Sequence, residues 1–426
     1  PERRRSVNAI DLYEGITLHQ GDCRDIMREY PDQHFDAVIT DPPYGISFRG
    51  EKWDTATPHG FQAWAQSWGE EALRVLKPGG YLLAFSAPRT YHRLTSGLED
   101  AGFEIRDTMA WIRADGKPAG MDIAASIDRG TMQTRDTLLR FTSWLRSTGI
   151  TYKQVNQATN SFMGSHYLTQ AKQPAIPTRA HWDSLLPLLE GTTIPEWVTD
   201  LVNDTHTANV LTEREGRDVR AINVEGTATG MASRNVKNAG EPIREEAKAW
   251  AGWGLGLKPA WEPITLARRP VEGGSTTANV VKHRVGALNI QAAADWNDGL
   301  YPPNLLMGEQ AMAAAVEQGA PDHVWPVFRY QPKAPKTERP VVGGVQHVTV
   351  KSLELMRYLI RLVVRPGSLI LEPFAGSGTT LQAAAMENTR AVGCELDDRY
   401  IPLIKERFKH GIEAPLNLFG LDGDAA

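Results

Sequence analysis

Both ends of the chain alternate short apolar runs with amphipathic segments, and the middle does not. The first part predicts strands and helices in turn, at residues 35–40, 61–76, 81–85, 90–101 and 103–112. The last part continues the alternation, at residues 352–364, 368–371, 380–387, 390–394 and 398–409. Strands separated by helices of this length are typical of a largely parallel sheet. We therefore expect one α/β sheet, with helices on both faces, that is built from both ends of the chain. Residues 77–80 (Lys-Pro-Gly-Gly) are expected to end the helix at 61–76 in a turn.

The middle, residues 130–250, is polar and poor in strand-like runs. It predicts a mostly helical inserted domain, so the chain divides into residues 1–129, 130–250 and 251–426. Inside the insert, a helix is expected at 135–146 and a second at 152–158 with Thr151 as its N-cap. A third is expected at 162–168 after a turn, and the last two together resemble a helix-turn-helix.

The bulk composition excludes several classes of protein. The chain has 426 residues, no apolar run of membrane-spanning length and no apolar signal region behind its N-terminal charges. Two distant cysteines cannot form a disulfide framework or a multi-cysteine metal site, and they fit a reducing cytoplasm. A net charge of −5 disfavours a protein that coats nucleic acid. An enzyme that grips DNA in one cleft can still be acidic overall.

The first motif that carries chemistry is Asp41-Pro42-Pro43-Tyr44, which directly follows the apolar run at 35–40. Ligands of open α/β sheets bind at the carboxyl ends of strands, so the motif is placed where a site is expected. Asp41 and a backbone carbonyl of the proline pair can accept both hydrogens of an exocyclic amine on a base, and Tyr44 can stack on that base. A tight surface turn uses the same residue types, which the motif alone does not exclude.

The second motif is the glycine-rich segment 372–380, which leads from a strand into a helix. No lysine follows Gly378, which excludes a phosphate-binding P-loop, and Leu381 stands where a dinucleotide fingerprint needs its third glycine. Glu395 closes the next strand, where an acid can bind ribose hydroxyls. The combination favours a nucleoside-bearing cofactor without a pyrophosphate. An acid that is merely exposed at a strand end is the alternative.

Together the two motifs resemble the DNA amino-methyltransferases of the N6-adenine/N4-cytosine type, in the permuted (β-class) order with the catalytic motif first. The resemblance extends to residues 20–23, 73–80, 328–334, 338–339 and 347–351, and residues 253–264 resemble phage and prophage enzymes. Val348 departs from the commoner His-Pro-Thr pattern. The resemblance implies a Rossmann-like sheet that binds S-adenosylmethionine, no metal, double-stranded DNA as partner, base flipping, and a cytoplasmic location, and it permits a homodimer.

The resemblance also assigns roles to residues. It makes Asp41, Pro42, Pro43 and Tyr44 catalytic. It implies cofactor contacts from Asp22, Cys23, Asp41, His347, Thr349, Lys351, Glu372, Phe374, Ala375, Gly376, Ser377, Gly378, Thr379, Thr380, Glu395 and Leu396. It makes the insert the target-recognition region, where Lys153, Ser165 and His166 are expected near DNA. A small helical packing unit without base contacts is the alternative for that region. We expect Trp53, Trp64 and Trp68 to be core or wall residues.

The expected reaction is methyl transfer to adenine N6 in duplex DNA. Cytosine N4 is the nearest alternative, because the same arrangement serves both amines, and Asp as the first residue of the motif favours adenine. Methylation of RNA or of a protein glutamine is a more distant alternative, disfavoured by the motif order and by the insert. An inactive DNA-binding partner would carry a degraded motif, and neither motif is degraded.

Overall fold

The computed structural model describes residues 9–46, 54, 57–112, 122–128, 135–169, 173–210, 242, 245–257, 260–295, 299, 301–307, 317, 334, 338–347, 349–409 and 412. The chain forms two compact units, one of residues 1–116 and 260–426 and the other of residues 117–259. We call them the catalytic unit and the helical unit. Trp53, Val348 and residues 328–333 lie outside the described residues. In the part of the chain that is described, no helix is long and apolar enough to cross a membrane.

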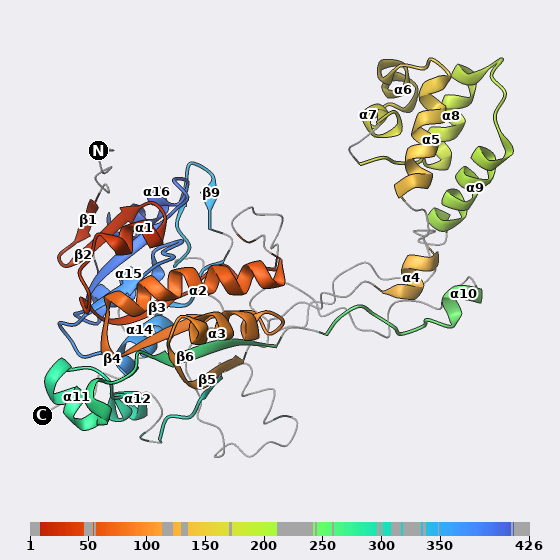
Figure 1. Ribbon diagram of the computed structural model, residues 1–426. Coiled ribbons are helices and arrows are strands. Elements are labelled where there is room, and N and C mark those ends of the chain that lie inside the picture. The colour runs from red at the N-terminus through yellow and green to blue at the C-terminus, as the bar shows by residue number, and fades with distance from the viewer. Residues whose placement is uncertain are drawn as a thin grey trace, which may run out of the picture. The chain divides into compact units, whose positions relative to one another are not determined.

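The catalytic unit is organised by a sheet in the order β1-β2-β11-β10-β3-β4-β6-β5-β7. Figure 1 labels its strands β1 to β6. Its strands are β1 (Ala9–Tyr13), β2 (Ile16–Gln20), β3 (Phe35–Thr40), β4 (Leu76–Phe85), β5 (Glu104–Ile112), β6 (Trp261–Arg268), β7 (Leu305–Met307), β10 (Leu369–Glu372) and β11 (Arg390–Glu395). The five consecutive strands from β2 to β4 are parallel, so their carboxyl ends meet at one edge. β6 runs antiparallel to β4 and β5, so β6 begins at that same edge.

Helices cover both faces of the sheet, as the sequence predicts. Residues that alternate along β3 and β4 enter two separate apolar clusters, because successive side chains of a strand point to opposite faces. One cluster contains α1 (Cys23–Arg28), α2 (Pro58–Val75) and α3 (Tyr91–Asp100). The other contains α12 (Ile290–Asp295), α14 (Leu353–Val363), α15 (Thr379–Met386) and α16 (Ile401–Lys409). The unit also contains η5 (Glu272–Gly274), α11 (Thr276–His283) and the hairpin β8 (Val341–Val342) and β9 (Val345–Gln346).

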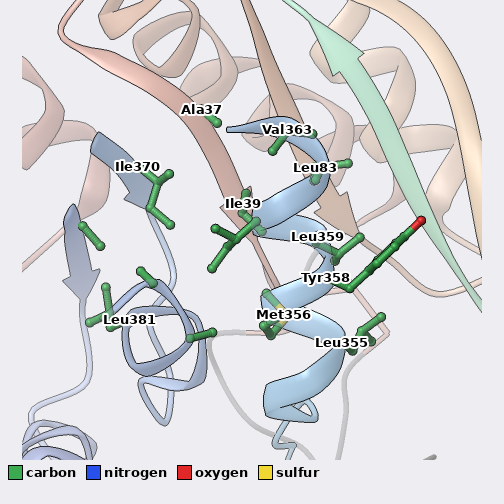
Figure 2. Close-up of a cluster of buried hydrophobic side chains, with 14 of the residues drawn as sticks. Ala37, Ile39, Leu83, Leu355, Met356, Tyr358, Leu359, Val363, Ile370 and Leu381 are labelled. Carbon is green, nitrogen blue, oxygen red and sulfur yellow. The ribbon is translucent and has the colours of Figure 1, made fainter. Parts of the chain in front are cut away.

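Helix α14 shows how this packing follows from the sequence. Met356, Leu359 and Val363 recur at helical spacing and are buried, and Figure 2 shows them directed towards Ile39 of β3 and its neighbours. Ser352 precedes the helix, and Lys351 precedes Ser352. The packing of α14 against the sheet thus fixes the place of Lys351 beside the carboxyl end of β3.

The expected turn at residues 77–80 is wrong, because β4 already begins at Leu76, directly after α2. Phe35 pairs with Leu76 and Ala37 with Tyr81, so the residues between them bulge out of the ladder without ending the strand. Gly79 takes φ +77, and a Cβ there would lie 2.3 Å from the Asn279 amide nitrogen. The glycines permit a bulge here instead of a turn.

The helical unit contains α4 (Ile123–Asp128), α5 (Arg135–Ser147), α6 (Tyr152–Thr159), α7 (Gly164–Tyr167), α8 (Arg179–Leu185), η3 (Leu186–Leu189), α9 (Glu196–Val210) and α10 (Glu245–Lys248). Its core is a separate cluster around Phe141, Leu145, Trp182 and Val198. Thr151 caps α6 as predicted, in a reciprocal capping box with Gln154.

Two helices start later than expected. α7 starts at Gly164 instead of residue 162 and has four residues. The Ser161 hydroxyl accepts from Met163 N–H, a local turn that replaces the first helical turn. α16 starts at Ile401 instead of residue 398, because the Asp397 carboxylate accepts from Arg399 N–H in a similar turn.

Candidate active site

The Asp41–Tyr44 motif follows β3, the central strand of the sheet. Pro42 is buried, and Asp41, Pro43 and Tyr44 are partly buried. The Tyr44 hydroxyl lies 2.9 Å from Asp41 Oδ1, so the loop closes on itself through its own two functional side chains. The prolines fix φ across the loop and hold its carbonyl groups in place.

The far end of this loop is clamped by Asp54, which the sequence did not single out. Its carboxylate, 2% exposed, accepts from the N–H groups of Gly45 (2.7 Å) and Ile46 (3.2 Å). Gly45 has φ +65, and a Cβ there would lie 2.8 Å from the Phe61 ring. The loop is therefore held from both sides and is not a free surface turn.

A lysine and a second carboxylate complete the site. Lys351 Nζ lies 2.6 Å from Asp41 Oδ2, 3.1 Å from the Tyr44 hydroxyl and 3.5 Å from Glu262 Oε2. The Tyr44 hydroxyl also lies 3.0 Å from Glu262 Oε2. The sequence predicted a cofactor contact for Lys351 and gave Glu262 no role. An acid at the start of a buried strand was the available signal for Glu262.

The charges around Tyr44 determine its state. Burial, together with the carboxylates of Asp41 and Glu262, holds the pKa of the Tyr44 hydroxyl well above its ordinary value of 10. The hydroxyl therefore keeps its proton and acts as a donor to these carboxylates.

The glycine-rich turn follows β10, the strand next to β3. Glu372 ends β10, is 1% exposed and accepts three hydrogen bonds, from the hydroxyls of Thr40 and Thr380 (2.5 Å each) and from Phe374 N–H (3.0 Å). Burial raises the pKa of Glu372 to about 8, although these donors oppose the shift. Because Thr40 immediately precedes Asp41, Glu372 joins the two motifs directly.

Gly376 and Gly378 both have left-handed backbones, with φ of +54 and +80. A Cβ at Gly376 would lie 3.1 Å from His347 Nε2, and one at Gly378 would lie 2.9 Å from Ile404. Glycine is thus required here both by the backbone conformation and by close packing against side chains of the protein.

Glu395 at the end of β11 fixes the same turn. Its Oε2 accepts from Gly376 N–H (2.7 Å) and its Oε1 from Asp397 N–H (2.8 Å). Burial raises the pKa of Glu395 to about 7. Leu396, which follows, is 66% exposed at the sheet edge.

Asp22 stands at the end of β2, beside Glu395. Gln20 pairs with Glu395 in the parallel ladder, and Gly21 N–H donates to the Glu395 carbonyl at 2.9 Å. Asp22 caps α1, and its ion pair with Arg24 (2.6 Å) lowers the pKa of its carboxyl. Cys23 is buried beneath it, and burial raises the pKa of its thiol to about 12.

The rest of the turn is pinned by Arg407 of α16, which is 7% exposed. Its guanidinium donates to the Ser377 carbonyl (2.5 Å), to the Ser377 hydroxyl (3.2 Å) and to the Thr379 hydroxyl (3.1 Å). Ala375 N–H donates to the carbonyl of Cys394 in β11 at 2.8 Å. Ala375, Ser377 and Thr379 are thus held by groups on β11 and α16.

His347 packs against this turn. Its ring lies 4.4 Å from that of Tyr400, centroid to centroid, and its Nδ1 contacts the Thr349 carbonyl. Burial lowers the pKa of His347, which favours a neutral imidazole. Thr349 itself is exposed.

An aromatic wall adjoins the turn on the α2 side. The Phe374 ring lies 5.4 Å from that of Trp64 and 5.5 Å from that of Trp68, and Phe61 stacks on Trp64 at 5.6 Å. Trp68 is fully buried and Trp64 partly buried, as expected of core and wall residues.

The residues expected near DNA lie in the helical unit. Lys153 on α6 and Ser165 on α7 are exposed, and the partly exposed His166 ring contacts the Gln173 carbonyl through Nδ1 at 3.1 Å. Ser165 lines an open hollow of about 570 Å³ with Arg146, Thr151 and Tyr152. Among the residues that the structure describes, no cluster of His, Cys, Asp and Glu could hold a metal ion.

Comparison with known proteins identifies a family over most of the chain. The family model described as DNA methylase, of the N6/N4 type, matches residues 35–159 and 230–406, more than half of the chain. The type II methyltransferase M.HindIII of Haemophilus influenzae is 35% identical over 148 residues, which are 34% of this chain and 40% of that protein. M.BamHI of Bacillus amyloliquefaciens is 32% identical over 74 residues, 17% of this chain and 18% of that protein. The chain thus spans well under two thirds of the length of these relatives.

Among solved structures, the cytosine-N4-specific PvuII DNA methyltransferase aligns over 95% of this chain and 88% of its own, with 13% identity and a TM-score of 0.42. The M1.HpyAVI–SAM complex aligns over 92% and 98%, with 13% identity and a TM-score of 0.38. The match to the family model covers both strand-end motifs, Asp41 to Tyr44 and the glycine-rich turn. The chain belongs to the N6/N4 DNA methylase family.

Proposed function

We propose that this protein transfers a methyl group from S-adenosylmethionine to adenine N6 in double-stranded DNA, at one short recognition sequence. The observation that carries the proposal is the adjacency of the two motifs. β3 and β10 are paired and parallel, so the Asp41 loop and the glycine-rich turn leave the sheet at one edge, joined by Glu372. A reacting amine at Asp41 therefore lies next to the turn that would hold the cofactor.

The residues around the turn fit a nucleoside-bearing cofactor. Glu395 ends β11, and Asp22 follows the end of its parallel neighbour β2, which supports a role for Glu395 in binding the ribose and for Asp22 in binding the adenine of the cofactor. The tight turn at Gly376 and Gly378 allows close backbone approach, and the remaining proposed contacts come from Cys23, His347, Thr349, Lys351, Glu372, Phe374, Ala375, Ser377, Thr379, Thr380 and Leu396. S-adenosylmethionine, when bound, supplies an electrophilic methyl group.

Asp41 and the Pro42 carbonyl act on the target amine. An exocyclic amine is a poor nucleophile, because its lone pair is delocalised into the ring. Two acceptors that bind its two N–H groups favour a pyramidal nitrogen whose lone pair points out of the ring plane. The Tyr44 ring stacks on the base after it leaves the duplex.

The helical unit is proposed to recognise the target sequence. It is inserted between β5 and β6, two strands of the catalytic sheet, and it has a core of its own. Lys153, Ser165 and His166 would contact bases or phosphates.

Sequencing of DNA from a methylation-free bacterial host that expresses the protein, with modified bases read in context, tests the proposal. We expect N6-methyladenine at one motif. N4-methylcytosine would retain the mechanism and change the base. Absence of any modified base, with the protein folded and binding S-adenosylmethionine, would contradict the proposal.

The purified Asp41→Ala variant tests the assigned role of Asp41. Loss of one acceptor that acts on the reacting group should lower kcat by about 100- to 1000-fold. The affinity for S-adenosylmethionine, measured by calorimetry, should stay within about twofold of wild type (under about 0.5 kcal/mol), because most of the proposed cofactor contacts come from the glycine-rich turn, Asp22 and Glu395 rather than from Asp41. Normal methylation by this variant would refute the mechanism.

A further inference from the structure

One ammonium group in the active site is shared between two carboxylates. Lys351 Nζ lies 2.6 Å from Asp41 and 3.5 Å from Glu262, and the Lys351 side chain is 9% exposed. The faces of Phe85 and Trp111 enclose the ammonium, with ring centroids at 4.7 Å and 5.9 Å. Such aromatic faces attract a cation without fixing its direction, so they permit a short movement between the two carboxylates.

Glu262 reaches this position because of the sheet topology. β6 is antiparallel to β4, so its first residues lie at the edge where the parallel strands end. Glu262 pairs with Trp111 of β5, and Phe85 of β4 pairs with Ile264. The carboxylate is therefore placed at the active site by two ladders of backbone hydrogen bonds, and its side chain is 14% exposed.

Both oxygens of Asp41 have protein partners in the structure. Oδ1 accepts from the Tyr44 hydroxyl at 2.9 Å, and Oδ2 accepts from Lys351 Nζ at 2.6 Å. A target amine that donates to Asp41 competes with these partners. The short contact with Lys351 is the stronger competitor, because it joins two opposite charges.

We propose that Glu262 is a positioning residue, which draws the Lys351 ammonium away from Asp41 when the target amine enters. This inference rests on the proposed function. With Glu262 present, one ammonium is shared by two carboxylates, and Asp41 can turn an oxygen to the amine while Lys351 stays paired. Without that second carboxylate, Lys351 pairs with Asp41 alone and weakens it as an acceptor. Glu262 also accepts the hydrogen bond of the Tyr44 hydroxyl when that hydroxyl no longer donates to Asp41, since the hydroxyl already lies 3.0 Å from Glu262 Oε2.

Glu262→Gln tests the inference, because the amide keeps the size of the side chain and removes its charge. The measurement is single-turnover methylation of a duplex that carries the motif found by sequencing. We expect the rate constant to fall by about 10- to 100-fold, which corresponds to about 1.4–2.7 kcal/mol. We expect unchanged affinity for S-adenosylhomocysteine, unchanged KM for DNA and an unchanged melting temperature.

Glu272→Gln is the matched control, since Glu272 also pairs with a lysine (Lys282, 2.7 Å) but lies on the surface. It should methylate at the wild-type rate. The Lys351→Met background sharpens the test. Where there is no ammonium to move, adding Glu262→Gln should change the rate less than twofold.

A wild-type rate in Glu262→Gln would overturn the inference. A lower rate together with a raised KM for DNA and a lowered melting temperature would also overturn it, because that pattern indicates a role in folding. An undiminished loss in the Lys351→Met background would overturn it too, because Glu262 would then act independently of Lys351. If the wild-type protein itself methylates no DNA, the proposed function fails first. The failures are therefore distinguishable.

Discussion

Polar side chains are used differently in the two units of the molecule. In the catalytic unit, the candidate site residues Glu372, Glu395, Lys351 and Arg407 are at most 8% exposed and are bonded to several partners. In the helical unit, Lys153 and Ser165 are exposed, while the core is formed by apolar side chains such as Phe141 and Trp182. The candidate active site of the first unit is built from pre-arranged buried groups, whereas the residues proposed to contact DNA in the second unit face solvent.

This difference has an energetic consequence. A buried polar group that loses its partner costs about 1–3 kcal/mol, whereas an exposed one returns to water at little cost. Substitutions at the catalytic unit's polar residues should therefore affect folding and cofactor binding strongly. Substitutions at the exposed polar residues of the helical unit should affect DNA binding alone. Three predictions test this contrast.

The largest effect is expected at Glu372. Glu372→Ala leaves the hydroxyls of Thr40 and Thr380 and the N–H of Phe374 without their buried acceptor. We expect a loss of about 3 kcal/mol or more in the free energy of unfolding, measured by urea denaturation. Glu372→Gln should cost less, because its amide oxygen still accepts.

The pH dependence of stability gives a second measurement at the same residue. The pKa of Glu372 is about 8 in the folded protein against 4.5 ordinarily, so the folded state holds a proton that the unfolded state has lost. Stability should therefore fall as pH rises from about 4.5 to 8, by at most about 1.4 kcal/mol per pH unit from this group. Glu395, with a pKa raised to about 7, contributes in the same direction up to that pH.

Glu372→Gln should flatten this decline, because glutamine does not titrate. An equally steep decline in wild type and variant would show that Glu372 is ionised at neutral pH in the folded protein. Glu70→Gln is the control, because Glu70 is a surface carboxylate that accepts from the neutral Gln66 amide, and it should leave the slope between pH 5 and 8 unchanged.

A smaller effect, measured in cofactor binding, is expected at Arg407. Arg407→Lys keeps the charge but loses the planar fork that reaches Ser377 and Thr379 together. The turn should loosen, and the affinity for S-adenosylmethionine should fall by about tenfold, or 1.4 kcal/mol, in calorimetry. Arg399→Lys is the control, because Arg399 is exposed and pairs with Asp397 alongside the same turn. Equal losses in both variants would contradict a specific role for Arg407.

The same contrast explains what the sequence could predict. The strands that place Asp41 and the glycine-rich turn were recognisable, because apolar runs followed by helices determine a parallel sheet and hence one functional edge. Residues 253–264 were singled out only by their resemblance, without a role for Glu262, because the approach of Glu262 to Asp41 depends on pairing between residues far apart in the sequence. Residues 77–80 show the converse error, since local turn chemistry was outweighed by the ladder of β4 with β3 and β6.

Roles within the turn were equally hidden from sequence. The glycines at 376 and 378 indicated close approach of a ligand, yet they also pack against His347 and Ile404 of the protein itself. Arg407 lies thirty residues beyond Ser377, at the end of a helix that has an ordinary amphipathic pattern. Such contacts follow from tertiary packing and leave no local signature.

The smallest effect is expected at Lys153. If this exposed lysine contacts a DNA phosphate, Lys153→Ala should weaken DNA binding a few-fold and reduce the slope of log affinity against log salt by about 0.9. Unfolding by urea should be unchanged, because the side chain faces solvent. Lys282→Ala, an exposed lysine of the catalytic unit paired with Glu272, is the control and should keep the wild-type slope. A wild-type slope in Lys153→Ala would exclude this contact. A fall in stability without a change in slope would mean that Lys153 contributes to the packing of α6. The helical unit would then use its polar side chains for folding, as the catalytic unit does, and the contrast between the two units would be lost.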